Sequence, residues 1–258
     1  MFDFFRREPK KEEKKLPIEE DFSDIEQLIL YIKNEIGIDF FNKKDIIKNK
    51  LKLFCRKQDI YSFKELLASI KKDFSLKQEV IDYLTVNETY FFRETKQIED
   101  MIKKAKILGF KVEILCAPSS SGDEPYTIAI MMLEAGFKPA DFHIVGIDIS
   151  ETIINKAMLA TYRERNLHKI SKELKEKYFL KDGKQYILKD IVKNQVTFRR
   201  INIFDKSLQN LRKFDFIFSR NMMIYFDYET KIKAKNILRN LLKREEDSIY
   251  FGHADMLN

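Results

Sequence analysis

Residues 111–148, KVEILCAPSSSGDEPYTIAIMMLEAGFKPADFHIVGID, contain the pattern that decides the fold. An apolar run at 111–117 is broken by Pro118 and Gly122, and Glu124-Pro125 then opens a helical stretch that reaches about residue 136. A second apolar run covers 142–147 and is closed by Asp148. Short runs that are apolar throughout are typical of strands covered on both faces, and a helix between two strands indicates that they are parallel.

The pattern continues towards the C-terminus. Residues 151–160 predict a second helix, 196–203 and 214–219 predict further strands, Asp227 caps a helix that runs to about 243, and 248–252 predicts a last strand. The long Lys-rich stretch 163–195 is expected to hold a helix and a small hairpin. Strands that alternate with helices indicate an α/β domain whose parallel sheet is wound on both faces.

The N-terminal third has a different periodicity. Ser23 and Glu26 form an apparent capping box before an apolar helical face that ends at Gly37, and 42–57 predicts a basic helix. Ser62 and Glu65 open a third helix through residue 70, and 76–84 predicts a fourth. We therefore predict three parts: a flexible arm at 1–20, a small all-α domain at 21–86, and the α/β domain at 87–258.

Composition excludes several classes of protein. The 258 residues are 44% hydrophobic, which excludes wholesale disorder, and no apolar run approaches the roughly 18 residues of a membrane span. The N-terminus lacks an apolar signal core, so a cytoplasmic protein without membrane insertion is expected. Two distant cysteines and three scattered histidines exclude a disulfide scaffold and argue against a metal site. A monomer is expected.

Positive charge is concentrated in two regions. The chain carries 48 Lys and Arg against 41 Asp and Glu, a net +7. Residues 41–80 carry 11 − 5 = +6 and residues 163–213 carry 15 − 6 = +9, so the remainder sums to 7 − 15 = −8. Such a distribution favours an acidic partner, although a solvated lysine-rich surface would look the same. The basic regions lack the aromatic residues of a single-strand binder and any zinc-finger motif, which favours an acidic protein over nucleic acid.

The loop at 117–125 and Asp148 together predict a nucleoside ligand without phosphate. In doubly wound sheets, ligands bind beyond the carboxyl ends of the strands. The loop has one glycine and the acids Asp123 and Glu124, which oppose a pyrophosphate and suit a cationic amino group. Asp148 stands 26 residues after Gly122, where nucleoside-binding sheets place a carboxylate for the ribose. S-adenosylmethionine has both features, whereas a plain loop and an acid at a strand end would each also be common without a ligand.

Three further segments carry polar side chains towards the same edge. Asn202 follows a predicted strand and could read an adenine edge, or only form a turn. The run 214–227 leads from a strand into Arg220 and Asn221 and then Tyr225, which are hard to explain as core. The segment 87–94, NETYFFRE, places Arg93 among aromatics, where a guanidinium can bind a carboxylate through two parallel N–H···O bonds. A surface arginine in a domain linker is the simpler interpretation of Arg93.

Five motifs occur in one order that resembles a known family. They are NETYFFRE (87–94), CAPSSSGDEPYTIAI (116–130), VGIDIS (145–150), FDFIFSRNMMIYFD (214–227) and FGHA (251–254). This order resembles the chemotaxis receptor methyltransferases, which use S-adenosylmethionine to methylate glutamate side chains of methyl-accepting chemotaxis proteins. Residues 21–86 are similar to the N-terminal helical domain of that family. The resemblance implies a class I, Rossmann-like methyltransferase domain that gives S-adenosylhomocysteine as product and acts on the acidic helical bundles of receptor cytoplasmic domains.

The resemblance also implies roles for individual residues. Arg93 and Tyr225 would be catalytic, with Tyr225 touching the incoming glutamate. Among the cofactor-binding residues, Glu124 would bind the amino-acid end and Asp148 the ribose, and Asn202 and Ile203 would flank the adenine. The full cofactor set implied is Asn87, Thr89, Arg93, Gly122, Glu124, Asp148, Asn202, Ile203, Arg220 and Asn221.

The chain departs from the family pattern at a few positions. Asp123 and Asp255 stand where the family usually has Glu, and Ser150 stands where it usually has Asp. The family continues past the last motif into a final antiparallel strand. The sequence stops at Asn258, so that strand is expected to be missing, replaced or lost by truncation. Some relatives grip a receptor C-terminal peptide with a small β-subdomain, and the short 182–195 stretch with one glycine argues against that contact in this chain.

Two other functions compete with receptor methylation. A nucleic-acid methyltransferase is suggested by the basic charge, but enzymes that act on ring amines carry two prolines after the position of Asn221, and Met222-Met223 stand there instead. A non-catalytic adaptor of the same fold would bind cofactor or receptor only, and the intact set of Asn87, Arg93, Glu124 and Asp148 argues against it.

Overall fold

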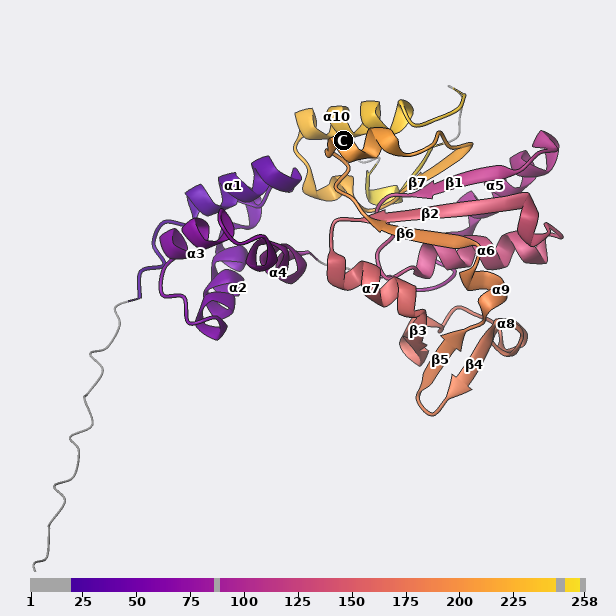
Figure 1. The fold of residues 1–258 in the computed structure, drawn as a ribbon, viewed down its shortest axis with the longest axis horizontal. Coiled ribbons are helices and arrows are strands. Elements are labelled where there is room, and N and C mark those ends of the chain that lie inside the picture. Colours follow the sequence, from indigo (N-terminus) through magenta and orange to yellow (C-terminus); the bar gives the residue numbers. More distant parts are fainter. Residues whose placement is uncertain (1–19, 86–88, 245–248, 256–258) are drawn as a thin grey trace, which may run out of the picture.

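The computed structural model describes residues 20–85, 89–244 and 249–255. The N-terminal part is a bundle of four α-helices around its own apolar core, in which Leu28, Leu51 and Leu66 are fully buried. Figure 1 shows this bundle as a separate lobe beside the α/β domain. The helices are α1 (Glu26–Ile36), α2 (Lys44–Lys57), α3 (Phe63–Ile70) and α4 (Phe74–Leu84), with a short 3₁₀ turn η1 (Phe41–Lys43) before α2.

The predicted helix ends are confirmed in part. Gly37 ends α1 in the left-handed conformation, with φ at 79°, as its position suggested. Ser62 caps α3 and its hydroxyl accepts a hydrogen bond from the Glu65 N–H, as predicted. The capping box at Ser23 is wrong, because α1 begins only at Glu26 and the Ser23 hydroxyl donates to Asp21 instead.

The second part is built on a five-stranded parallel sheet, which confirms the predicted α/β class. The strand order is β6-β2-β1-β7-β8, so the first strand along the chain lies in the middle and the order reverses beside it. The strands are β1 (Val112–Cys116), β2 (Phe142–Asp148), β6 (Val196–Arg200), β7 (Phe216–Ser219) and β8 (Ile249–Phe251). Within the described residues this sheet has no antiparallel strand.

Helices cover both faces of the sheet, as Figure 1 shows. Side chains of β1 alternate between two cores: Ile114 packs with α5 and α6, whereas Leu115 packs with the core that includes α10. The helices of the α/β domain are α5 (Thr95–Leu108), α6 (Asp123–Glu134), α7 (Glu151–Leu159), α8 (Lys172–Tyr178), α9 (Asp190–Lys193) and α10 (Tyr228–Arg239). Short 3₁₀ turns are η2 (Pro139–Asp141), η3 (Glu164–Asn166), η4 (Lys206–Asn210), η5 (Met223–Tyr225) and η6 (His253–Asp255).

The stretch 163–195 forms a small β-subdomain that is richer than predicted. Beside the expected helix α8 and hairpin, strand β3 (Thr161–Arg163) joins β4 (Phe179–Asp182) and β5 (Gln185–Leu188) in an antiparallel sheet of order β3-β5-β4. Phe91 holds the subdomain to the core, because its buried ring packs edge-on against Tyr162 and Phe179.

Helix α5 was not predicted, although its sequence carries the signal. Ile98, Met101, Ile102 and Ala105 recur at helical spacing and are buried against the sheet. This periodicity stands directly after the change of pattern near residue 95, where a domain boundary and a helix give the same local signal.

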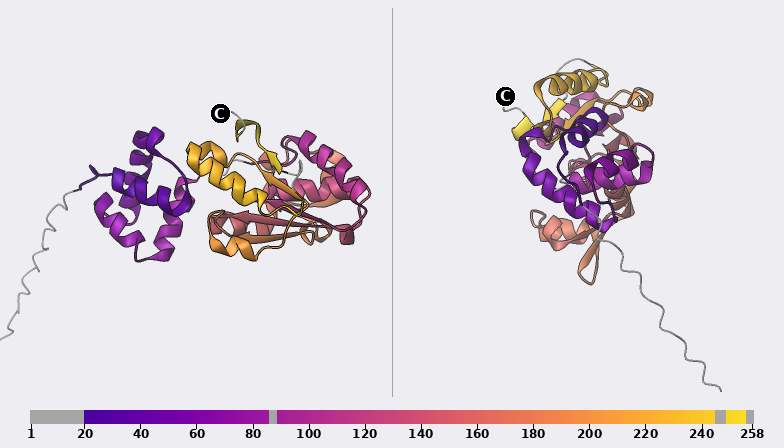
Figure 2. Two further views of the ribbon diagram at one scale, coloured as in Figure 1. Left: turned by 90° about the horizontal axis from the view of Figure 1, so that it is seen from above. Right: turned by 90° about the vertical axis from the view of Figure 1, so that its left-hand side faces the viewer.

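The helical bundle makes direct bonds to the α/β domain, and Figure 2 shows it beside the end of the sheet that carries η5 and α10. The Asp39 N–H donates to the Tyr225 carbonyl at 2.8 Å, and Lys33 pairs with Asp227 at 2.6 Å. The arm predicted at 1–20 lies outside the described residues except for Glu20, which pairs with Arg56. None of the helices in the described part of the chain is long and apolar enough to span a bilayer.

Candidate functional site

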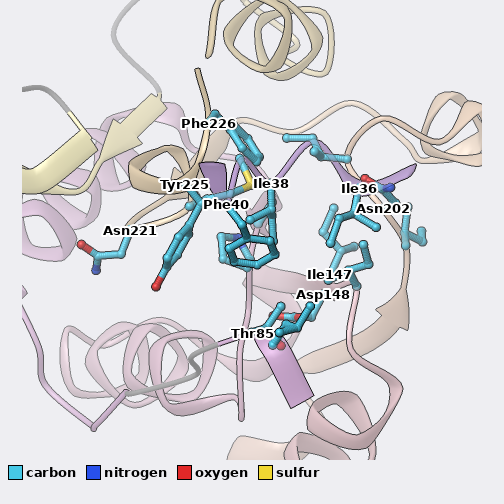
Figure 3. Close-up of a pocket in the computed structure, with 17 residues that line it drawn as sticks. Ile36, Ile38, Phe40, Thr85, Ile147, Asp148, Asn202, Asn221, Tyr225 and Phe226 are labelled. Carbon is cyan, nitrogen blue, oxygen red and sulfur yellow. The ribbon is translucent and has the colours of Figure 1, made fainter. Parts of the chain in front are cut away.

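A pocket opens at the carboxyl edge of the parallel sheet, where the predicted ligand site lies. Its floor comes from the ends of β1 and β2 and from the segment after β6, and the helical bundle supplies one wall. Figure 3 shows Phe40, Tyr225 and Phe226 grouped on one side, with Ile36, Ile147 and Asn202 on the other. Five residues of the predicted set line this pocket: Asp148, Asn202, Ile203, Asn221 and Tyr225.

Asp148 is the buried carboxylate of the pocket. It ends β2, is 5% exposed, and accepts hydrogen bonds from the Ser120 and Ser150 N–H groups, both at 3.0 Å. Burial raises the pKa of this carboxyl to about 6, and the backbone N–H groups only partly oppose that rise. The side chain therefore offers an anionic acceptor above about pH 6. No cation of the described residues is paired with it, as a site for neutral hydroxyl groups requires.

Asn202 lies at the opposite side of the pocket, but its side chain is already engaged. Its amide donates to the Glu35 carbonyl at 2.9 Å, and its oxygen accepts the Phe204 N–H at 3.0 Å. The first bond ties the segment after β6 to the C-terminal turn of α1. Asn202 therefore shapes the wall beside Ile203, and any contact of its side chain with a purine edge would share these bonds.

Glu124 and Arg220 form a buried ion pair rather than two separate pocket residues. The Arg220 guanidinium, 4% exposed, donates from Nε to the Glu124 carboxylate and from Nη1 to the Arg93 carbonyl at 3.0 Å. It also reaches the Glu94 carbonyl at 3.2 Å. Arg220 thus fixes the motif segment 89–94 to the edge of the sheet, where β1 and β7 end.

Several buried oxygens of Glu124 and of the segments after β1 and β7 have no hydrogen-bond partner among the described residues. They are Oε1 of Glu124 and the hydroxyls of Ser119, Ser120 and Ser219. Buried polar atoms are almost always paired in folded proteins, so these free oxygens indicate missing partners: the carboxylate oxygen needs a donor, and each hydroxyl can accept or donate. An α-ammonium group supplies three donors, and these residues therefore fit the amino-acid end of S-adenosylmethionine, with its adenosine end in the apolar pocket at Asp148.

The loop after β7 is held by Asp255, whose role the sequence did not reveal. This buried carboxylate accepts the Asn221 N–H, the Met223 N–H at 2.8 Å and the Gly252 N–H at 3.2 Å. A Cβ at Gly252 would lie 2.8 Å from the Asn221 nitrogen, so only glycine permits this approach. Asp255 therefore sets where Asn221 and Tyr225 stand, and the motif FGHAD was the signal for it.

Tyr225 keeps its hydroxyl proton. Burial, and then the charge of Asp255, raise the pKa of the phenol above its usual value of 10. The Lys43 ammonium lies 5.4 Å from the centre of its ring. The side chain can therefore donate a hydrogen bond to a carboxylate at any physiological pH.

The remaining predicted residues do not line this pocket. Thr89 lines a second, polar cleft towards the β-subdomain, and the Arg93 guanidinium lies 5.7 Å from the ring centre of Tyr90. Gly122 begins α6 with φ at 86°, and a Cβ there would meet Tyr126 and Phe198, so packing and backbone conformation require the glycine. Asn87 lies outside the described residues.

Asp123 faces away from the pocket. Its carboxylate is fully buried, accepts the Ser121 hydroxyl at 2.6 Å and the Asn166 amide at 3.1 Å, and has its pKa raised by burial. It therefore joins the cofactor loop to the β-subdomain and cannot hold a ligand amino group. Of the two acids predicted for that role, only Glu124 is placed for it.

The contribution of the helical bundle to the pocket was also missed. Ile36, Ile38, Phe40 and Thr85 line it, and the Gln78 amide of α4 donates to the Ile149 carbonyl at 2.9 Å. The Gln78 oxygen accepts from Arg200 at the end of β6, at 2.9 Å. Ile36 belongs to the apolar face of α1, Ile38, Phe40 and Thr85 follow helix ends, and nothing in the spacing of these residues shows that they meet the sheet. The described residues contain no group of three or more His, Cys, Asp or Glu that could hold a metal.

Comparisons with known proteins agree with this geometry. The family description "CheR methyltransferase, SAM binding domain" matches residues 87–258, and "CheR methyltransferase, all-alpha domain" matches residues 23–85. A chemotaxis protein methyltransferase from Campylobacter jejuni subsp. jejuni is 37% identical over 237 residues, covering 91% of this chain and 88% of the relative. One from Borreliella burgdorferi is 33% identical over 254 residues, with the same coverage.

A third relative, from Listeria innocua, is 28% identical over 246 residues, which cover 91% of this chain and 92% of that protein, and it is also a chemotaxis protein methyltransferase. The family matches cover most of the chain, and both the parallel sheet and the helical bundle are where the family's two domains require them. The chain belongs to the CheR methyltransferase family.

Proposed function

We propose that this protein transfers a methyl group from S-adenosylmethionine to glutamate side chains of chemotaxis receptors, giving glutamate methyl esters. The observation that carries the proposal is the pairing of a buried, cation-free carboxylate, Asp148, with the unpaired acceptors at Glu124 and the neighbouring serines. The first suits ribose hydroxyls and the second an α-ammonium group, and S-adenosylmethionine carries both. The names of the relatives support the receptor as the methyl acceptor.

The roles of individual residues belong to the same proposal. Asp148 accepts the ribose hydroxyls, Ile203 and Asn202 flank the adenine, and Glu124, held by Arg220, accepts the ammonium group. Asn221 closes the methionine end, and Thr89 would stand at its entrance. The loop that ends at Gly122 supplies backbone rather than side-chain contacts. These assignments rest on the pocket lining and on the ion pair.

The methyl acceptor needs no general base. A glutamate carboxylate has an ordinary pKa near 4.3 and is already ionised at pH 7. When bound, S-adenosylmethionine supplies a methyl group on a cationic sulfur. The task of the chain is therefore to place a carboxylate in line with that methyl group, an effect that supplies roughly 7–11 kcal/mol in favourable cases.

Arg93 and Tyr225 are placed to orient the acceptor. The carbonyl groups of Arg93 itself and of Glu94 accept hydrogen bonds from Arg220, so the backbone of Arg93 is fixed to the cofactor side of the site. Its guanidinium would hold one carboxylate oxygen, and the protonated Tyr225 hydroxyl would donate to the carboxylate from η5. A pairing that was too tight would stabilise the substrate as well as the transition state, so two moderate donors serve better than one buried cation.

Helix α2 supplies a basic surface for docking to an acidic helical bundle, although its own domain neutralises part of that charge. Lys44 pairs with Glu26, and Arg56 and Lys52 both reach Glu20. The Lys50 ammonium lies 5.3 Å from the ring centre of Tyr83. The remaining charge would steer association, so the methylation rate should fall as salt rises towards physiological strength, where the Debye length is about 8 Å.

The test is transfer of tritiated methyl from S-adenosylmethionine to receptor cytoplasmic fragments, scored as base-labile methyl ester. Arg93→Ala should lower kcat/KM about 100-fold because the acceptor loses its alignment, with S-adenosylhomocysteine affinity by calorimetry almost unchanged. Arg239→Ala, on the exposed end of α10, is the control and should leave both values as they are. An equal loss of cofactor affinity in Arg93→Ala would remove its substrate-orienting role.

The same assay separates the competing functions. A non-catalytic adaptor would bind S-adenosylhomocysteine and receptor fragment without forming ester. Labelling of RNA in place of receptor would support the nucleic-acid methyltransferase.

A further inference from the structure

A cationic cleft separates the core of the α/β domain from the β-subdomain. Its walls come from α7, β3 and η3, and it reaches Ser121 of the cofactor loop and Thr89 and Tyr90 of the motif segment. Four basic or potentially basic side chains line it: Lys156, Arg163, Arg165 and His168. No Asp or Glu lines it within the described part of the chain.

The basic side chains of this cleft form no ion pairs with the residues that the structure describes. Lys156, Arg163 and Arg165 are exposed, and none of the three has a side-chain ion pair to a described residue. Glu164, which stands between the two arginines, pairs with Lys175 and accepts the Tyr186 hydroxyl, both on the subdomain's own sheet and helix. The charge of Lys156 acts weakly on Asp123, but the buried Asp123 carboxylate is hydrogen-bonded to Ser121 and Asn166.

The contrast with helix α2 is direct. There, Glu20 and Glu26 neutralise Arg56 and Lys44 within the same domain. Unpaired cations that converge in a concave site, with no internal acid against them, indicate an anionic ligand more strongly than a basic helix surface does.

The cleft begins where the proposed acceptor site ends. The ring of Tyr90 is touched on one side by the Arg93 guanidinium, 5.7 Å from its centre, and on another by His168, with ring centres 4.7 Å apart. Tyr90 itself lines the cleft. A receptor helix that presents a carboxylate to Arg93 can therefore continue past Tyr90 towards Arg163 and Arg165.

We propose that this cationic cleft binds the acidic side chains that flank the target glutamate on its helix, and so selects which glutamates are methylated. The inference rests on the proposed function. In an α-helix, residues three, four and seven positions away share one face, with a rise of 1.5 Å per residue. A target glutamate at Arg93 thus places acids one or two turns away against Arg163 and Arg165, with Lys156 at the α7 wall. The preferred substrate is a helix with an acidic stripe in line with the target.

The test compares two charge-reversed proteins and two substrates. Arg163→Glu/Arg165→Glu alters the cleft, and Lys172→Glu/Lys184→Glu makes the same change of charge on exposed positions of the same subdomain outside the cleft. The substrates are a receptor cytoplasmic fragment with acids one turn from the target glutamate and the same fragment with those acids replaced by Gln.

The cleft variant should raise KM for the acidic fragment about tenfold or more, with kcat and S-adenosylhomocysteine affinity unchanged, and should methylate the Gln fragment as well as the wild type does. The control pair should change KM by less than about threefold through long-range charge alone. The inference would be overturned if the cleft variant and the control variant raised KM equally, or if the cleft variant raised KM equally for the two fragments.

Fluorescence anisotropy of the labelled fragments separates this inference from the proposed function. If the wild type binds the acidic fragment, the cleft variant does not, and no methyl transfer is seen, the inference about the cleft stands and the proposed function fails. If the wild type and the cleft variant transfer methyl groups equally well, the proposed function stands and the inference about the cleft fails. Tighter cleft-dependent binding of a single-stranded RNA oligonucleotide than of the fragment would overturn the assignment to an acidic helix.

Discussion

The two ends of the candidate cofactor site solve the problem of a buried carboxylate in opposite ways. At one end Asp148 accepts backbone N–H groups and has no ion pair to a described residue, and burial raises its pKa to about 6. At the other end Glu124 has the Arg220 guanidinium against one oxygen, and its second oxygen has no partner among the described residues. The difference follows the proposed ligand: neutral hydroxyls need an acceptor without a competing cation, whereas a cationic ammonium group can share a carboxylate that is already held in place.

The largest effect on stability is expected at Arg220, the cation that holds Glu124 and has no counterpart among the described residues at Asp148. Arg220→Ala leaves the Glu124 charge buried without a partner and frees the segment that carries Arg93, so the free energy of unfolding should fall by about 3–5 kcal/mol. Denaturant titration measures this. Lys172→Ala removes an ammonium group from its pair with Glu176, in which the two side chains are 85% and 69% exposed, and should cost about 1 kcal/mol or less.

A second variant tests the cause of the Arg220 effect. Arg220→Ala/Glu124→Leu removes the stranded charge and should recover a large part of the lost stability while cofactor binding stays weak. If the double variant is no more stable than Arg220→Ala, the lost stability comes from the released segment 89–94 and not from the unpaired Glu124 carboxylate.

Asp148→Asn should weaken binding of S-adenosylhomocysteine about 100-fold in calorimetry, because two hydroxyls lose a charged acceptor worth roughly 1.5–3 kcal/mol. The same exchange at Asp190, whose side chain is 78% exposed, should leave binding as it is. Unchanged affinity in Asp148→Asn would show that this carboxylate does not bind the ribose, and the contrast between the two ends of the site would then have no basis in the ligand.

The raised pKa of Asp148 gives cofactor binding a dependence on pH. The ionised form accepts the ribose hydroxyls, so affinity should be full above about pH 7 and fall about tenfold between pH 7 and pH 5 as the carboxyl takes up a proton. The sign for stability is opposite: the folded state holds this proton more tightly than the unfolded chain does, so the stabilisation present below pH 4 is lost as pH rises through about 6. Calorimetry and denaturant titration at three pH values check both, and an affinity that rose on acidification would contradict the ionised acceptor.

The smallest effect is expected at Gln78, which supports the Asp148 end from the helical bundle. Gln78→Ala removes the bonds to the Ile149 carbonyl and Arg200, so the cofactor KM should rise about three- to tenfold with little change in kcat. Gln58→Ala, which loses an exposed bond to Glu79, is the matched control. A change in kcat alone would point to the acceptor side instead.

Much of the fold could be predicted because local signals and long-range packing agree. The apolar runs at β1 and β2 are buried on both faces, as such runs are in a parallel sheet, and Gly37, Ser62 and Asp227 end or begin helices through bonds within a few residues of chain. The failures have the same kind of cause. The Ser23 box matched a pattern, but Asp21 competes for the hydroxyl, and β3 is too short to carry a period of its own.

For the site, residue types and motif order were enough to predict the kind of ligand and the main carboxylate of the pocket. The loop 117–125, Asp148 and the motif order indicate a nucleoside sulfonium, since those side chains leave β1 and β2 at one edge of the sheet. Which of the two acids of the loop lies on the proposed cofactor side depends on three-dimensional packing. Asp123 and Glu124 are adjacent in the chain, yet successive helix positions point about 100° apart, so one meets the β-subdomain and the other Arg220. Contacts such as those of Gln78, Asp255 and the cationic cleft join residues far apart in sequence, and their meeting depends on how the domains pack rather than on any local pattern.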